Sequence, residues 1–426
     1  MEADNKIILD KINVNKNRVE YYFSISGCYD KYFNHEKFMY IEYDYDIEDI
    51  PESLLAIAFV ANTIPFIWLC NGSMEIYDLD KTFYESLESI KGGFQEMYPN
   101  ISFLGAIKVN KITKNTYDFE HEAAQLFSGG LDALTTFIRI KEKSPYLITH
   151  YGADIKTENE ETWNVLKNKV EEFGTEYNVK NIFIKSNGRE FLNEKKIAED
   201  FNKLLGHSWY YGIQHGLMLI CFSIPLMVKL KVKTLYIASS NHEGSELDFG
   251  YIPSAGSDPR VDNKIKFASG DVFHDSYELD RIKKVKVIID YAKQSNKKLF
   301  LKVCHNQDSR TNCCNCEKCY RTIITIIAQG GDPNDFGFEI NGDIGLNFKK
   351  FLNNEIINIG DDYIIEEWYP IKRILIKNYS EINKKFNIGW FLSYDMKKER
   401  KKKIIIYRLK NFIPIIKRKI VNIKKG

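Results

Sequence analysis

Residues 124–132 read Ala-Gln-Leu-Phe-Ser-Gly-Gly-Leu-Asp, and this segment constrains the fold more than any other. Small and apolar residues lead into Ser-Gly-Gly, and a helical pattern follows at once, as expected for a buried strand, a tight loop and a helix start. Adjacent glycines let the backbone adopt positive φ, and N–H groups at a helix N-terminus attract an anion. The segment predicts a phosphate-binding loop, with an ordinary turn as the alternative.

Two side chains of this loop suit a nucleotide. Ser128 adds a hydroxyl donor, and Asp132 is placed to hold Mg²⁺, which prefers carboxylate and phosphate oxygens. The pattern Gly-x-x-x-x-Gly-Lys-Ser/Thr does not occur in the chain, which argues against a P-loop nucleotide hydrolase.

A group of cysteines forms a second motif, spaced Cys-x8-Cys-x2-Cys-x2-Cys at Cys304, Cys313, Cys316 and Cys319. Two tight steps bring thiolates together as tetrahedral zinc requires. Cys314 does not fit the spacing and is not expected to be a ligand. A redox pair of Cys313 and Cys316 is the alternative, because a thioredoxin-like motif needs only two cysteines.

The loop and the cysteine motif together resemble the PP-loop ATP pyrophosphatases, and within them the 7-cyano-7-deazaguanine synthases of queuosine biosynthesis. The resemblance covers about residues 120–330, roughly half of the chain. It implies Mg²⁺-dependent cleavage of ATP to AMP and pyrophosphate, together with structural zinc. The ATP-binding residues that it implies are Ser128, Gly129, Gly130, Leu131, Asp132, Tyr151 and Gly152.

The resemblance extends more weakly to other elements. Tyr151-Gly152 matches the end of a family strand, Asp258 and Arg260 match a substrate-binding Asp-x-Arg element, and Arg281 matches a cation that faces the phosphates. Asp132 and Arg281 are therefore the expected catalytic residues.

The chain also departs from the family pattern. Ala133 replaces a Ser and removes a hydroxyl from the loop, which Thr135 and Thr136 are not expected to replace. Residues 153–155, Ala-Asp-Ile, replace the usual Gln-Arg-His, which puts the family's substrate in question.

From Ala124 onward, apolar strand patterns alternate with amphipathic helical patterns. This order predicts an α/β fold with a central parallel sheet and helices on both faces, of the adenine nucleotide α-hydrolase-like type that the resemblance implies. Ligands of such sheets bind beyond the carboxyl ends of the strands. We expect segments 128–132, 151–154 and 239–243 to meet at that edge. The strands are expected at 124–127, 146–151, 181–185, 234–238 and 299–303.

The sequence predicts four regions: a small α+β module over residues 1–118, the nucleotide-binding domain with the cysteine group over 119–335, an appendage over 336–396 and a basic tail over 397–426. The long Gly-, Ser- and Asp-rich segment 241–274 is expected to be a substrate-binding lid, with a solvated surface loop as the alternative. The apolar runs 54–69 and 216–228 are expected to be buried elements.

Charge is unevenly distributed. The chain has a net charge of +2, but residues 397–426 hold 13 Lys and Arg and one Glu, so the tail carries +12 and the remainder −10. Such a tail fits an anionic membrane, a nucleic acid, or an acidic protein surface, including that of the chain itself. Pro414 is expected to break or kink a helix there. The N-terminus has no signal-peptide pattern, so the expected location is cytoplasmic.

The expected function is ATP-dependent adenylation of a carboxylate or amide, which a nitrogen nucleophile then attacks. The expected cofactors are ATP, Mg²⁺ and Zn²⁺, and the substrate is expected to be a small carboxylate or deazapurine. The extra regions are compatible with a relative in anti-phage defence that modifies a macromolecule, and a homodimer is a further expectation. A tRNA-modifying enzyme and a nucleotide-binding module without turnover remain alternatives.

Overall fold

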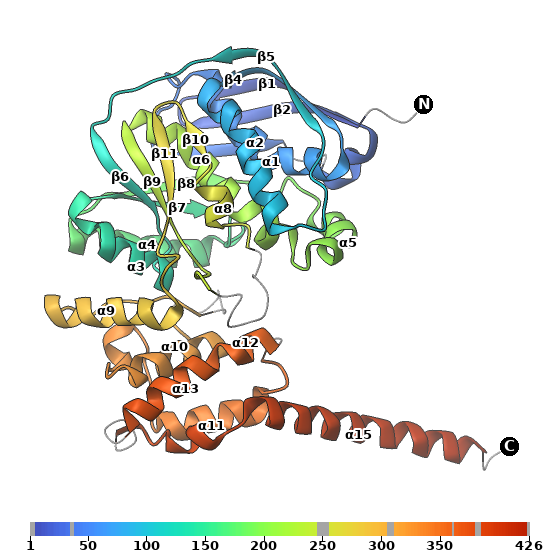
Figure 1. Ribbon diagram of the computed structural model, residues 1–426, viewed down its shortest axis with the longest axis vertical. Helices are drawn as coiled ribbons and strands as arrows, with labels where there is room; N and C mark the ends of the chain where they lie inside the picture. The colour runs from blue at the N-terminus through green and yellow to red at the C-terminus, as the bar shows by residue number, and fades with distance from the viewer. Residues whose placement is uncertain are drawn as a thin grey trace. The chain divides into compact units, whose positions relative to one another are not determined.

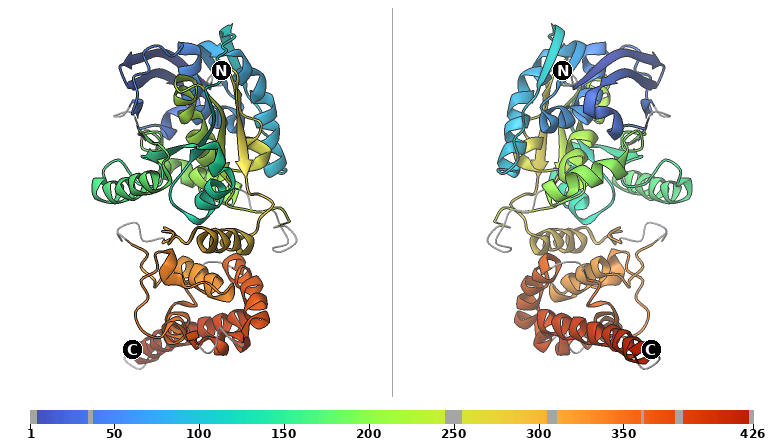
Figure 2. Two further views of the ribbon diagram at one scale, coloured as in Figure 1. Left: turned by 90° about the vertical axis from the view of Figure 1, so that its left-hand side faces the viewer. Right: turned by 90° about the vertical axis from the view of Figure 1, so that its right-hand side faces the viewer.

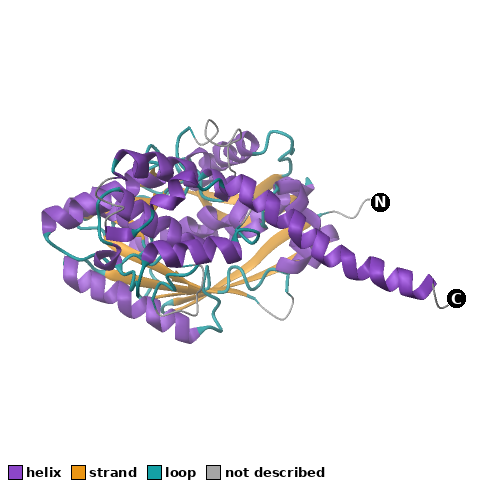
Figure 3. Ribbon diagram, turned by 90° about the horizontal axis from the view of Figure 1, so that it is seen from below, coloured by secondary structure: helices purple, strands orange, loops and turns teal. Residues whose placement is uncertain are grey.

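The computed structural model describes residues 5–34, 38–244, 255–304, 311–359, 362–379 and 385–423, with the backbone alone for 362–363 and 410–423. The chain divides into two compact units, Met1–Lys284 and Val285–Gly426. Figure 3 shows the strands in orange, and every strand of the described residues belongs to the first unit.

The first unit is built on one sheet, in which the described strands follow the order β10-β11-β9-β6-β7-β8-β3-β2-β1-β4-β5 (Figure 1). The neighbours β11, β9, β6, β7 and β8 are mutually parallel, which confirms the predicted parallel sheet, although β11 was not among the predicted strands. The parallel strands are β6 (His121–Leu126), β7 (Tyr146–Tyr151), β8 (Asn181–Ser186), β9 (Val232–Ala238) and β11 (Gly270–Asp275).

The strands of residues 1–118 extend this same sheet. They are β1 (Lys6–Asn15), β2 (Arg18–Ser26), β3 (Met39–Tyr43), β4 (Ser73–Asp80) and β5 (Ala106–Thr113). β3 pairs antiparallel with β8 through Ile41–Ser186, Glu42–Lys185 and Tyr43–Ile184. The sheet therefore crosses the boundary predicted near residue 118 without a break, because the edge of β8 is completed by an N-terminal strand.

Helices cover both faces of the parallel strands. His150 of β7 contacts Ser223 of α6 (His215–Lys229), whereas the next residue, Tyr151, stacks on Trp163 of α4 (Glu160–Tyr177). Successive strand residues point to opposite faces, so α6 and α4 lie on opposite sides of the sheet. Phe137 of α3 (Leu131–Ile140) packs on Phe173 of α4, and α1 (Glu52–Cys70) packs on α6.

The two apolar runs form core helices, as predicted. The segments Glu52–Cys70 and Tyr210–Lys229 are long and apolar enough to cross a membrane, but 89% and 78% of their most apolar windows are buried inside the fold. Both contain a proline, Pro65 and Pro225, within a continuous helix. A π-helical turn, Tyr210–Gln214, precedes α6. The other helices of the first unit are α2 (Lys81–Met97), α5 (Glu194–Leu205) and α8 (Pro259–Asp262).

Three buried polar groups join the core helices to the loop after β8. The amide of Asn62 in α1 donates to the Gly188 carbonyl at 2.8 Å. The Gln214 amide donates to Asn62 Oδ1 at 2.6 Å and to the same carbonyl at 2.9 Å. Buried polar groups require such partners, so this network fixes where the chain leaves β8.

The second unit is helical in its described residues. Its helices are α9, which begins in the first unit (Arg281–Ser295), α10 (Glu317–Ala328), α11 (Ile344–Glu355), α12 (Asp362–Glu366), α13 (Trp368–Lys377) and α15 (Met396–Ile423). Residues 299–303, predicted as a strand, pair with no strand of the described chain. Phe348 packs on both Tyr320 of α10 and Trp368 of α13, so the predicted appendage shares its core with the helix that follows the cysteines. Pro414 does not interrupt α15.

Candidate functional site

The loop after β6 leads directly into the N-terminus of α3. Phe127 N donates to the Ile148 carbonyl at 2.8 Å, which extends the pairing with β7 as far as the loop. Gly129 has φ +70°, a backbone conformation that favours glycine. Gly130 precedes α3 without a side-chain cap, and Ser128 is exposed. Apart from Gly129 and its two neighbours in the chain, no atom of the described residues lies within 4 Å of a Cβ built at Gly129, so the loop faces open space at a helix N-terminus.

A buried lysine holds the carboxylate of this loop. Lys284 Nζ lies 2.9 Å from Asp132 Oδ1 and also donates to the Ser239 carbonyl. The Lys284 side chain is 2% exposed and that of Asp132 is 32% exposed. The resemblance singled out Arg281 as the cation, but the structure puts Lys284, one helical turn later, against Asp132. The three-residue spacing puts Arg281 and Lys284 on one side of α9 but does not by itself identify Asp132 as the partner.

The hydroxyl groups that follow the loop are engaged elsewhere. Thr135 Oγ1 donates to the Leu131 carbonyl within the helix at 2.9 Å, and Thr136 Oγ1 donates to Asp275 Oδ2 at 2.8 Å. Ala133 has no hydroxyl, and its carbonyl accepts a hydrogen bond from Gln125. Ser128 is therefore the side-chain hydroxyl at the loop, as the sequence predicted.

Five parallel strands bring their carboxyl ends to the edge that contains this loop. Segments 128–132, 151–154 and 239–243 follow β6, β7 and β9, as predicted. The sequence reasoning did not include Asn187–Glu190 after β8 or Ser276 after β11. The segment predicted to be a lid is structured in part: residues 255–274 include α8, β10 (Lys266–Phe267) and most of β11. Residues 245–254 lie outside the described chain.

Tyr151 and Gly152 have structural roles at this edge. Tyr151 is buried, stacks on Trp163 at 4.6 Å and donates its hydroxyl to the Thr157 carbonyl. It lines a pocket of about 380 Å³ with Trp163, Phe183 and Lys185, a pocket that does not include the 128–132 loop. A Cβ at Gly152 would lie 1.7 Å from the Ser186 carbonyl oxygen, so β7 and β8 approach too closely there for any side chain. Their contact with ATP stays a prediction.

Asp258 and Arg260 bind each other. Asp258 Oδ1 accepts from Arg260 Nε at 2.7 Å, and Oδ2 accepts from Nη2 at 2.8 Å. Asp258 is 2% exposed and also caps α8 through the Arg260 N–H. This bidentate pair orders the start of α8. A role in substrate binding stays a prediction.

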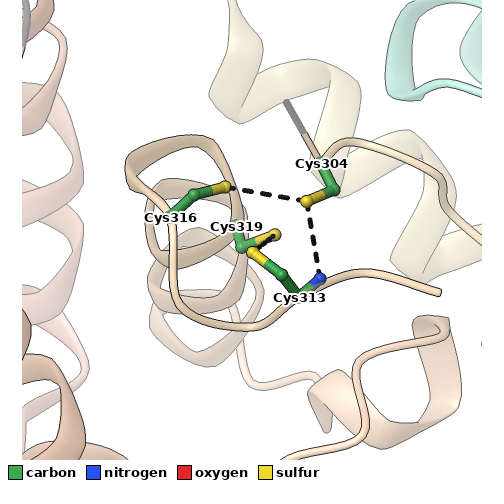
Figure 4. A group of neighbouring side chains, drawn as sticks. All are labelled: Cys304, Cys313, Cys316 and Cys319. Carbon is green, nitrogen blue, oxygen red and sulfur yellow. Dashed lines mark hydrogen bonds between the residues drawn. The ribbon is translucent and has the colours of Figure 1, made fainter. Parts of the chain in front are cut away.

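The cysteine group of the second unit has the geometry of a metal site. The Sγ atoms of Cys304, Cys313, Cys316 and Cys319 all lie within 4.8 Å of one another (Figure 4). Two of the distances, Cys304–Cys316 and Cys313–Cys319, are 3.9 Å. Zn–S bonds of ~2.3 Å in a tetrahedron require S–S separations of about 3.8 Å. These thiols can therefore hold a tetrahedral ion such as zinc.

Local structure explains how the four thiols meet. Cys316 precedes α10 and Cys319 lies in its first turn. The buried side chain of Asn312 accepts from the N–H groups of Val303 and Cys304 and donates to the Leu301 and Gly337 carbonyls. Asn312 thereby positions Cys304 beside Cys313, and the sequence reasoning missed it.

Cys314 does not belong to this cluster. It has φ +51°, and its Sγ donates to the Asn312 carbonyl at 3.5 Å. Burial raises the pKa of Cys313 to about 11, and the neighbouring thiol of Cys316 together with burial raises that of Cys319. A bound cation opposes this effect, because metal ligation favours the thiolate.

The sequence matches no family model, and no curated protein matches it.

Proposed function

We propose that this chain is an ATP-dependent adenylating enzyme that cleaves ATP to AMP and pyrophosphate. The observation that carries the proposal is the open loop 128–132 at the N-terminus of α3, whose Asp132 is held by the buried cation Lys284. A triphosphate with Mg²⁺ matches this arrangement of backbone N–H groups, carboxylate and ammonium.

Each group has a defined task in this reaction. The N–H groups at Gly129 and Gly130 and the Ser128 hydroxyl bind phosphate oxygens. The Asp132 carboxylate would hold Mg²⁺, which would neutralise phosphate charge, and Lys284 would oppose the negative charge that develops on the departing pyrophosphate.

Adenylation activates an otherwise unreactive oxygen. A carboxylate oxygen of the substrate attacks the α-phosphorus, the bond to the β-phosphate oxygen breaks, and pyrophosphate leaves. A nitrogen nucleophile then attacks the acyl carbon, and AMP leaves with the former carboxylate oxygen. Little side-chain acid–base chemistry is needed, since ATP supplies the leaving group.

Zinc in this proposal is structural. Four thiolates fill the tetrahedral coordination sphere and leave no position for a catalytic water. A redox pair would instead require Cys313 and Cys316 to be free of metal. The pairing of Cys304 with Cys316 and of Cys313 with Cys319 at 3.9 Å favours the four-ligand site.

The substrate we propose is a small carboxylate, with a deazapurine similar to that of the 7-cyano-7-deazaguanine synthases as the first candidate. Attachment of such a group to a macromolecule, or modification of tRNA, would use the same chemistry. One observation favours nucleotide binding without turnover instead: Ala133 lacks a hydroxyl, and those of Thr135 and Thr136 are engaged.

Calorimetry with ATP and Mg²⁺, followed by pyrophosphate release with candidate carboxylates, tests the proposal. We expect Asp132→Ala to reduce pyrophosphate release about 10³-fold and Lys284→Met to weaken ATP binding at least ~10-fold. Lys283→Met is the matched control, because Lys283 is the preceding residue of α9 and its side chain is 61% exposed. Wild-type protein that binds no ATP, or equal losses in both lysine variants, would contradict the role of the loop. If the protein binds ATP but releases pyrophosphate with none of the carboxylates, the alternative of nucleotide binding without turnover is favoured.

A further inference from the structure

The C-terminal helix α15 begins in the fold of the second unit and continues beyond its other helices (Figures 1 and 2). Its start is held in place: Met396 is buried, Lys397 pairs with Glu366, and Lys403 Nζ donates to the Asn353 carbonyl. The first two turns are therefore part of the fold, and the remainder has a different environment.

Large apolar side chains on the following turns are exposed. Ile405, Tyr407 and Leu409 are 58%, 61% and 56% exposed, and Ile406 is 42% exposed. Clustered apolar exposure of this kind marks an interaction surface. Docking of the tail on an acidic protein surface, one of the sequence-based alternatives, would engage its cations but not these apolar side chains.

The apolar residues recur at helical spacing. Beyond Leu409, where the backbone alone is described, the sequence continues the pattern at three- and four-residue intervals. The resulting row on one side of the helix consists of positions 405, 409, 412, 416, 420 and 423. Basic residues cluster before, within and after this stretch of sequence, at 401–403, 417–419 and 424–425. α15 is thus a basic amphipathic helix.

We propose that α15 binds the surface of an anionic lipid bilayer. The apolar row enters the boundary between headgroups and acyl chains, and the surrounding Lys and Arg side chains contact lipid phosphates. A net charge of +12 over residues 397–426 supplies the attraction, and the row supplies the insertion.

Two other modes fit these observations less well. Residues 404–423 are long enough to span a bilayer, but five of them are Lys or Arg, which opposes burial in hydrocarbon. A nucleic acid would engage the cations but would leave the apolar row in water. The coexistence of the row and the cations is what favours a lipid surface. This inference is independent of the proposed adenylation.

Sedimentation of the full-length protein with vesicles tests the inference. The vesicles are phosphatidylcholine with and without ~30 per cent phosphatidylglycerol, and binding is measured at low, physiological and high salt. We expect binding only to the anionic vesicles, weakened as salt is raised. Replacement of two residues of the row, Leu409→Asn with Ile416→Asn, should weaken binding at least ~10-fold.

The matched control is Tyr407→Asn with Val421→Asn, which removes two apolar residues from the side of the helix opposite the row and should bind as wild type. Circular dichroism of each variant on vesicles reports whether the helix is retained. Gel shifts with tRNA test the alternative that α15 binds a nucleic acid. Equal binding to neutral and anionic vesicles, equal losses in both variants, or tRNA binding without vesicle binding would each overturn the inference.

Discussion

At the residue scale, two glycines of the same sheet edge differ in what they tolerate. A Cβ at Gly152, where φ is +95°, meets the Ser186 carbonyl oxygen at 1.7 Å, whereas at Gly129, where φ is +70°, it meets no atom within 4 Å. We expect Gly152→Ala to cost at least ~3 kcal/mol of unfolding free energy. Gly129→Ala should cost only about 1–2 kcal/mol, from its backbone conformation.

Urea unfolding of both variants measures this difference, and ATP binding separates structure from function. Gly129→Ala should be destabilised less than Gly152→Ala but should bind ATP more weakly than wild type, since its methyl group occupies the space that a phosphate would approach. Equal stability of the two variants would contradict the packing seen at Gly152.

A buried histidine predicts how stability depends on pH. Burial lowers the pKa of His150 to about 3; its Nε2 lies 3.0 Å from Ser223 Oγ, and its Nδ1 has no partner in the described chain. An unfolded histidine titrates near pH 6.5. Between these values the unfolded chain binds more protons than the folded one, so stability is lost as pH falls from 6.5 toward 3.

The slope attributable to one such group is at most about 1.4 kcal/mol per pH unit. Denaturant unfolding at pH 7 and in mild acid should show that His150→Asn flattens the dependence, with the exposed His207→Asn as control. A variant slope equal to that of wild type would remove His150 as the cause. Burial also lowers the pKa of His215, which contributes with the same sign.

At the scale of elements, the cysteine segment depends on one amide. Asn312 makes hydrogen bonds with four backbone groups, including the N–H of Cys304. Its removal leaves these groups without a partner, so Asn312→Ala should weaken zinc binding ~10–100-fold. Asn315→Ala is the control, since Asn315 contacts Cys313 Sγ through its backbone N–H.

The zinc affinity of both asparagine variants is measured from their metal content and by competition with a chelator. Cys314→Ser should retain zinc, while Cys313→Ser should lose it, because only the Cys313 Sγ faces the cluster. Loss of zinc from Cys314→Ser alone would show that the ligand set is wrong.

The sequence predicted elements best where one local pattern determined them. The apolar runs at 54–69 and 216–228, the strand before the loop and the cysteine spacing all carry their own signal. Leu299, Leu301 and Val303 are buried at alternate positions, as in a strand, but this segment pairs with no strand of the described residues. Burial alone does not distinguish a strand from an extended segment. Lys284 was missed because its partner Asp132 lies 152 positions earlier, a separation that no local pattern reveals.

At the scale of the whole molecule, one sheet joins residues 1–118 to the parallel strands that follow, although composition suggested two separate domains. The aromatic-rich N-terminal strands read as a module of their own, yet β3 pairs with β8 and α1 packs on α6. Which strand edge β3 pairs with depends on contacts between residues far apart in the sequence, and local sequence patterns do not reveal such contacts. Met1–Lys284 is therefore one compact unit, and we expect the 128–132 loop to depend on the N-terminal strands for its stability.

We expect the stability of the second unit to depend on zinc bound by its four clustered cysteines. Structural zinc commonly contributes ~10 kcal/mol or more of apparent binding energy, comparable to the ~5–15 kcal/mol stability of a whole domain. Val285–Gly426 contains the four ligands and no strand among its described residues. We expect a chelator to expose amides of α10, α11 and α13 to hydrogen exchange while β6, β7 and β9 stay protected, and added zinc to restore protection. Cys314→Ser should respond as wild type. Simultaneous loss of protection in both units would show that they unfold together and that the metal supports the whole chain.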